Sequence, residues 1–241
     1  MGGKREMGGE EEKKGNALVV VLGDFGRSPR MQYHAMSLAA QANMRVDVLA
    51  YEGTTPRPEL INHPDVRLHL LPVPQVDREK LPFVLYAAVK LTRQVAGLVW
   101  AYVWRVRRPN VTLVQTPPAI PTLLLFWLLS LTDGGRLIFD WHNFGYSLLA
   151  LGGPPAILVR AARLYEMACG PLADGNFAVT RAMARFLRTE WGVAAHVLHD
   201  QPPPFFRRVT AEERRSLLEK LGLSEHEGVR GCARCAAGLR G

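Results

Sequence analysis

Short apolar runs alternate with longer amphipathic stretches through the middle of the chain. Strands are predicted near 17–22, 45–51, 66–71, 111–115, 136–140, 176–180 and 195–199, and helices near 28–43, 83–104, 119–131, 155–170, 181–190 and 210–221. The strands are rich in Val, Leu and Ile without in-and-out alternation, which is typical of strands buried on both faces. This order predicts an α/β fold: a Rossmann-like parallel sheet with helices on both faces.

The two ends of the chain lack this pattern. Residues 1–16 are mostly Gly, Lys and Glu, and residues 224–241 carry Gly, Arg, Ala and Cys without periodicity, so both are predicted to be disordered tails. The proline run that follows Gln201 indicates a domain boundary. We therefore expect one Rossmann-like domain over 17–200, followed by a linker and a helix over 201–223.

The net charge and the cysteine count limit the classes of function that fit this chain. The net charge is +8, and Arg105, Arg107 and Arg108 follow an apolar stretch, which favours anionic partners. No zinc-finger spacing, basic zipper or aromatic RNA-binding signature accompanies the charge, so no nucleic-acid binding is predicted. Three cysteines are too few for a disulfide framework and indicate a reducing compartment. Cys232 and Cys235 supply only part of a zinc ligand set, so no metal site is predicted.

Two apolar segments bear on membrane contact. Residues 83–104 carry Lys90, Arg93 and Gln94 at their centre, and 119–131 is shorter than the roughly 20 residues that span a bilayer, so neither predicts a transmembrane helix. The N-terminal tail lacks the apolar core of a secretory signal. The first segment has two interpretations of nearly equal weight. It is either a helix on a bilayer surface, with the arginines that follow it on anionic lipid, or a helix packed on the sheet.

A polar loop, Gly23–Arg30, follows the first predicted strand. Ser28 suits the N-cap and Pro29 the first position of the helix that comes next. Glycines let a backbone approach a ligand, and a helix start attracts anions, so the loop can hold a phosphate. It is neither a Walker loop nor a dinucleotide fingerprint. By spacing alone, an ordinary strand-to-helix turn is the favoured interpretation.

A second polar loop, Phe139–Tyr146, places Asp140 and His142 two residues apart where a strand ends. The carboxyl ends of strands are where open α/β sheets bind ligands. The imidazole can take up a proton beside the carboxylate, or the carboxylate can act directly while His142 positions a substrate. The alternative is that Asp140 caps a backbone and His142 is a core residue. His34 falls in a helix and is expected to be packed or exposed rather than catalytic.

Four motifs, taken in order, carry a resemblance to a known family. They are GDFGRSPRMQYH at 23–34, VQTPPAIP at 114–121, DWHNFGY at 140–146 and DQPPPFF at 200–206. Together they resemble the chitobiosyldiphosphodolichol β-mannosyltransferase family over residues 17–223. The resemblance implies a two-domain GT-B fold, of which this chain carries the N-terminal, acceptor-side domain.

The resemblance also implies a function. The family transfers the first mannose from GDP-mannose to dolichyl-diphosphate-linked chitobiose in N-glycan precursor assembly, at the cytosolic face of the endoplasmic reticulum membrane. No cofactor is implied, since GDP-mannose is the donor substrate. The implied partners are the lipid-linked acceptor, the membrane surface and other glycosyltransferases of the same pathway. Because residues 224–241 depart from the family pattern, we expect the donor-binding domain to be missing and the chain to be inactive alone.

Within this family, the two loops gain expected roles. Formation of a β-mannoside from an α-linked donor implies inversion by a single displacement, in which the acceptor hydroxyl loses its proton as it attacks. Asp140 is the first choice for the base, with His142 as partner or alternate. Candidates for binding the substrate and its diphosphate are Gly23, Asp24, Gly26, Arg27, Ser28 and Asn143. The alternative function is a non-catalytic fragment that keeps the acceptor half and binds a membrane surface or a partner protein.

Overall fold

The structure, a computed structural model, describes residues 15–73, 82–202, 207 and 209–222. Contacts divide the chain into two units, Met1–Gln201 and Pro202–Gly241. The predicted tails lie outside the described residues, apart from residues 15 and 16. In the second unit, helix α8 (Ala211–Lys220) begins with a capping box between Thr210 and Glu213.

One parallel sheet forms the centre of the first unit, and its strand order is β3-β2-β1-β4-β5-β6-β7. The strands are β1 (Asn16–Asp24), β2 (Arg45–Tyr51), β3 (Val66–Leu71), β4 (Val111–Thr116), β5 (Arg136–Trp141), β6 (Gly175–Ala178) and β7 (His196–Val197). Strand β1 begins inside the segment predicted as a tail, which moves that boundary to Asn16. From β1 the chain adds β2 and β3 on one side of the sheet, and then β4 to β7 on the other side of β1. The point between β1 and β4 where the strand order changes side is where open α/β sheets bind ligands.

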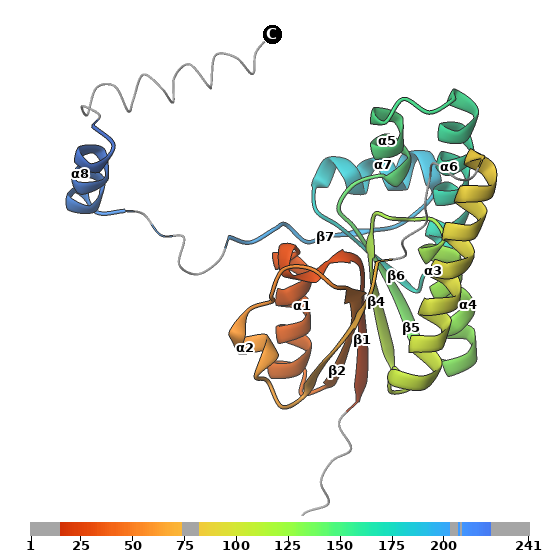
Figure 1. The fold of residues 1–241 in the computed structure, drawn as a ribbon, viewed down its shortest axis with the longest axis horizontal. Coiled ribbons are helices and arrows are strands. Elements are labelled where there is room, and N and C mark those ends of the chain that lie inside the picture. The colour runs from red at the N-terminus through yellow and green to blue at the C-terminus, as the bar shows by residue number, and fades with distance from the viewer. Residues whose placement is uncertain (1–14, 74–81, 203–206, 208, 223–241) are drawn as a thin grey trace, which may run out of the picture. The chain divides into compact units, whose positions relative to one another are not determined.

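Helices cover both faces of the sheet, as predicted (Figure 1). They are α1 (Pro29–Ala40), α2 (Pro58–Ile61), α3 (Phe83–Arg105), α4 (Thr122–Asp133), α5 (Gly145–Leu151), α6 (Ala156–Cys169) and α7 (Arg181–Trp191). Helices α1 and α2 lie on one face, and α3 and α4 on the other. Two short helices were not predicted: α2, and α5, which follows directly on the Asp140 loop.

The two cores explain why β1 is an unbroken apolar run from Ala17 to Leu22. Along β1, Leu18 and Val20 point into the core under α3 and α4, whereas Val19 and Val21 point into the core under α1 and α2. Successive side chains of a strand point to opposite faces, so a strand covered on both sides needs apolar residues at every position.

Two of the arginines that follow α3 pair with other parts of the protein. Arg107 pairs with the buried Asp47 of β2 through Nε–Oδ2 and Nη2–Oδ1 contacts of 3.0 Å each. Burial alone would raise the pKa of Asp47, but hydrogen bonds from His69 and Arg107 outweigh burial and lower this pKa to about 2. Arg108 donates to the carbonyls of Thr132 and Asp133 at the end of α4. Arg107 therefore joins the segment after α3 to the sheet, which agrees with the interpretation of a helix packed on the sheet.

Candidate functional site

The loops after β1, β4, β5 and β7 meet at the carboxyl edge of the sheet. Ser28 Oγ donates to Gln115 Oε1 over 3.0 Å, which joins the β1 loop to the end of β4. Arg30, in the first turn of α1, reaches Asp140 at the end of β5 and the carbonyl of Leu198 after β7. The two loops singled out in the sequence therefore lie at one edge of the sheet.

Asp140 is fully buried, and Arg30 holds both of its carboxylate oxygens. Arg30 Nε lies 2.8 Å from Oδ2, and Nη2 lies 2.8 Å from Oδ1. Burial alone would raise the pKa of Asp140, but hydrogen bonds from Arg30 and His34 outweigh burial and lower it to about 2. A carboxylate held in this way is a weak proton acceptor near neutral pH, which favours a positioning role for Asp140.

Two imidazoles flank this carboxylate. His34 Nε2 lies 3.2 Å from Asp140 Oδ2, and its ring stacks on Phe177. His142 Nε2 lies 4.0 Å from the same oxygen, and its side chain is 15% exposed. Its Nδ1 is buried without a hydrogen-bond partner among the described residues. Burial lowers the pKa of His142, and the Asp140 charge opposes this only in part. A neutral imidazole beside a fixed carboxylate is suited to accept a proton.

Asp24 joins the β1 loop to the loop after β2. Its carboxylate accepts hydrogen bonds from the backbone of Gly26 and from both the backbone and the hydroxyl of Thr54, and the Thr54 bonds chiefly lower its pKa. A Cβ at Gly26 would lie 2.1 Å from the Thr54 carbonyl oxygen, and one at Gly53 would lie 2.4 Å from the Asp24 carboxyl carbon. The two glycines are therefore needed where the loops touch, and Asp24 has a structural role.

The other loop candidates differ in what they offer a ligand. Ser28 is the residue before α1, as predicted, but its hydroxyl bonds to Gln115 rather than capping the helix. The Arg27 side chain is 81% exposed, with Nε 3.4 Å from Asp24. A Cβ at Gly23 would meet no atom within 4 Å, so the space on that side is open. Asn143 is exposed beside His142. Their roles in binding substrate stay predictions.

Glu166, in α6, holds the end of the Asp140 loop in place. It is buried in α6, and its Oε1 accepts from the backbone N–H of Tyr146 over 2.7 Å, at the start of α5. Burial raises the pKa of Glu166 to about 7. Glu166 is therefore a buried polar anchor for the start of α5.

Sequence reasoning missed Arg30 and underrated His34. Both lie in α1, on the first two turns of a helix that follows a different loop, more than a hundred positions from Asp140. The available signal was that Arg30 and His34 are four residues apart, which places them on one side of a helix. No pattern in one sequence shows that this side meets the end of β5.

The fold and this edge define a class: one Rossmann-like half of a GT-B glycosyltransferase. The profile of the glycosyl transferase 4-like domain matches residues 28–200, and the chain belongs to that family. The sheet is similar to that of sucrose-phosphate synthase from Thermosynechococcus elongatus, with a TM-score of 0.61 and 15% identity over 85% of this chain and 52% of that chain. This likeness shows the fold alone.

Curated relatives are more similar in sequence. The chain is 45% identical over 210 residues to UDP-glycosyltransferase TURAN of Arabidopsis thaliana, and 37% identical over 212 residues to chitobiosyldiphosphodolichol beta-mannosyltransferase of Yarrowia lipolytica. Each alignment covers 86% of this chain and 45% of the relative. The chain therefore spans less than half the length of the curated relatives it matches.

Proposed function

We propose that this chain is the acceptor-side half of a mannosyltransferase that transfers mannose from GDP-mannose to dolichyl-diphosphate-linked chitobiose. The observation that carries this proposal is the buried Arg30–Asp140 pair with His142 beside it, at the carboxyl edge of a glycosyltransferase domain. The choice of acceptor is supported by the names of relatives such as the Yarrowia lipolytica enzyme, because those names include chitobiosyldiphosphodolichol.

In the proposed reaction, His142 is the base and Asp140 positions it. The acceptor oxygen forms a bond to the anomeric carbon of mannose while the bond from that carbon to the diphosphate oxygen breaks, which inverts the configuration. GDP leaves with the electron pair, and the acceptor proton passes to His142. The Asp140 carboxylate, 4.0 Å away, then stabilises the imidazolium. Asp140 itself is less suited to take the proton because Arg30 holds both of its oxygens.

The acceptor diphosphate is proposed to lie on the Gly23–Ser28 loop. Arg27 supplies an exposed cation there, and Gly23 leaves an open approach to the backbone. Asn143 would then contact the sugar beside His142. Strands β1 and β5 are two positions apart in the sheet, or roughly 10 Å, so a sugar at His142 and a diphosphate at this loop fit one extended acceptor.

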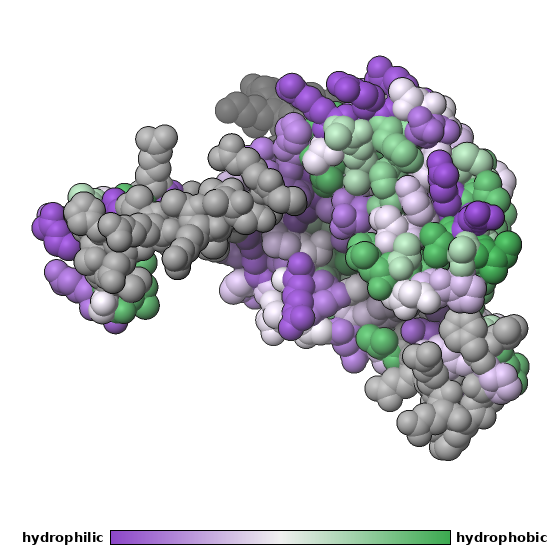
Figure 2. Space-filling model, turned by 90° about the horizontal axis from the view of Figure 1, so that it is seen from above, coloured by the Kyte–Doolittle hydropathy of each residue, from purple (hydrophilic) through white to green (hydrophobic). Residues whose placement is uncertain are grey.

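The proposed location is the cytosolic face of the endoplasmic reticulum membrane. Within the described residues, no helix has both the length and the apolar character to cross a bilayer. Exposed hydrophobic residues nevertheless lie on α3 and α4, among them Trp100, Val103, Trp104 and Leu131. The view from above in Figure 2 also shows hydrophobic surface on this unit. Such a surface suits contact with lipid headgroups and chains.

Binding of the acceptor head group tests the proposal. Calorimetry of the purified chain with chitobiosyl diphosphate, which lacks the lipid, is expected to show binding. Arg27→Gln should weaken it roughly tenfold, since a charge-assisted contact to phosphate is lost. Arg45→Gln is the matched control, because Arg45 is exposed at the opposite edge of the sheet. No binding, or equal affinity in the two variants, contradicts the proposal.

A further inference from the structure

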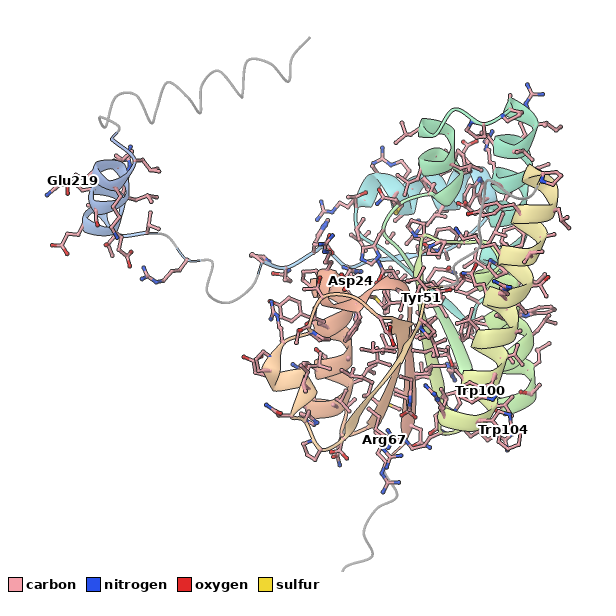
Figure 3. All side chains as sticks on the ribbon, in the orientation of Figure 1. Asp24, Tyr51, Arg67, Trp100, Trp104 and Glu219 are labelled. Carbon is pink, nitrogen blue, oxygen red and sulfur yellow. The ribbon has the colours of Figure 1, made fainter. Side chains whose placement is uncertain are left out.

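A cleft separates the second half of α3, from Arg93 to Arg105, from the edge of the sheet formed by β2 and β3. Its volume is about 910 Å³, and its walls include Tyr51, Leu70, Leu71, Val73, Gly97 and Trp100. From Arg93 to Arg105 the helix advances about 18 Å, which sets the length of this wall. Figure 3 shows Tyr51 at the carboxyl edge and Trp100 towards the other end of α3. The cleft is therefore long and mostly apolar.

The cleft lies beside the point on α3 where burial of its side chains begins. Among the described residues of the helix, none from Leu85 to Gly97 has a buried side chain, and Leu98 is the first that does. A Cβ built at Gly97 would meet no atom within 4 Å, although Gly97 lines the cleft. A helix of this length gains its stability in a protein chiefly from packing an apolar face. The cleft therefore has space for an occupant beside Gly97.

One end of the cleft adjoins the acceptor site. Tyr51 lies opposite Asp24 in the β1–β2 ladder, and the two residues lie close together in Figure 3. Thr54, three residues further on, bonds to the Asp24 carboxylate. From β2 to β5 there are three strand spacings, or roughly 14 Å. Along the carboxyl edge the order is thus His142, the Gly23–Ser28 loop, and the mouth of the cleft.

We propose that this cleft binds the apolar chain of the lipid-linked acceptor, adjacent to its diphosphate. This inference rests on the proposed function and adds a lipid subsite to it. The ligand must have an anionic head group followed by an apolar chain. The Gly23–Ser28 loop, which is proposed to bind the head group, carries Arg27, and the wall of the cleft includes Leu70, Leu71 and Trp100. A bilayer surface is flat and would leave a concave cleft unfilled, whereas a single isoprenoid chain can enter it.

The test uses two soluble probes on the whole chain, inorganic diphosphate and farnesyl diphosphate. The farnesyl chain is expected to tighten binding by at least about tenfold, since it buries several methylene-sized groups. Gly97→Leu should remove this gain by filling the cleft, and Gly97→Ala should remove part of it. Ala96→Leu is the matched control, because Ala96 is exposed on the same helix and does not line the cleft.

A second variant guards against a folding defect. Val73 is 52% exposed and lines the cleft, so Val73→Gln should reduce the farnesyl gain without disturbing a core contact. Equal affinity for the two probes overturns the proposal. The proposal is also overturned if farnesyl diphosphate still binds more tightly than inorganic diphosphate in both Gly97→Leu and Val73→Gln. If that difference in affinity is lost in Trp104→Ser instead, the lipid chain binds the exposed face of α3 and not the cleft. Chitobiosyl diphosphate binding tests the proposed function separately, so the two failures are distinguishable.

Discussion

Arg30 and Asp140 are 110 positions apart in the sequence, yet two contacts of 2.8 Å join the guanidinium to both carboxylate oxygens. The same guanidinium donates to the carbonyl of Leu198 and lies 3.2 Å from Asp200, where the chain leaves the sheet. One side chain of α1 thus fixes the end of β5 and the last part of the first unit. The geometry of the proposed site depends on this pair.

Removing one partner of this pair should cost much of the protein's stability. Arg30→Met leaves the buried Asp140 charge without its cation, and we expect the free energy of unfolding in urea to fall by about 3–5 kcal/mol. Arg27→Gln, at an exposed arginine three positions away, should change it by less than about 0.5 kcal/mol. The double variant Arg30→Met with Asp140→Leu should recover part of the loss. Equal losses at Arg30 and Arg27 would show that the pair is not structural.

Glu166 should make stability fall as pH rises towards neutrality. Its folded-state pKa is about 7, above the roughly 4.3 of an unfolded glutamate, because burial favours the protonated form. A group with a raised pKa contributes fully below the unfolded value and loses that contribution as pH rises through the folded value. Its loss between about pH 4.5 and 7.5 should reach roughly 2–3 kcal/mol.

Glu166→Gln isolates this dependence, since an amide oxygen can still accept from Tyr146 and does not titrate. We expect urea unfolding of this variant to be less dependent on pH than that of the wild type across this interval. Identical pH dependence in the two proteins would rule out Glu166 as the titrating group.

Vesicle binding should depend on the exposed end of α3. Arg105 stacks over Trp100 with its guanidinium carbon 4.6 Å from the ring centroid, and Trp104 is 75% exposed. In co-sedimentation with phosphatidylserine-containing vesicles, Arg105→Gln should weaken binding about fivefold, and added salt should have the same effect on the wild type. Trp104→Ser should weaken binding to neutral vesicles as well.

Arg45→Gln is the control for charge alone. Arg107 and Arg108 are unsuitable, because their partners are Asp47 and the end of α4. Vesicle binding that is unchanged in both the Arg105 and the Trp104 variants would exclude this surface as a lipid contact.

Local patterns predicted most of the fold. The strands β2 and β3 were predicted with their observed bounds, because each is rich in Val and Leu and is followed by a polar, proline-containing loop. Helix α5 was missed because its start is fixed from outside, by the buried Glu166 carboxylate that accepts from Tyr146. The strand order and the switch point between β1 and β4 follow from the packing of the whole sheet, which local periodicity does not encode.

The candidate site was predicted in outline only. Asp140 and His142 could be found because they follow a buried strand, and strand ends in such sheets meet at one edge. The sequence does not show that Arg30 occupies both Asp140 oxygens, and this contact moves the proposed base from Asp140 to His142. Similarly, Asp24 has the type and place of a sugar ligand, but its hydrogen bonds to Thr54 belong to the fold.

The central claim is that His142, held beside Asp140, removes the acceptor proton in mannose transfer. The most direct measurement is the rate of mannose transfer from GDP-mannose to phytanyl-diphosphate chitobiose by a chimera in which residues 15–200 replace the matching part of the Yarrowia lipolytica relative. His142→Ala should lower kcat at least about 100-fold with little change in acceptor affinity, and Asp140→Asn should lower it less. Near-normal turnover of a folded His142→Ala chimera, or no transfer by the unsubstituted chimera while the relative is active, would contradict the claim.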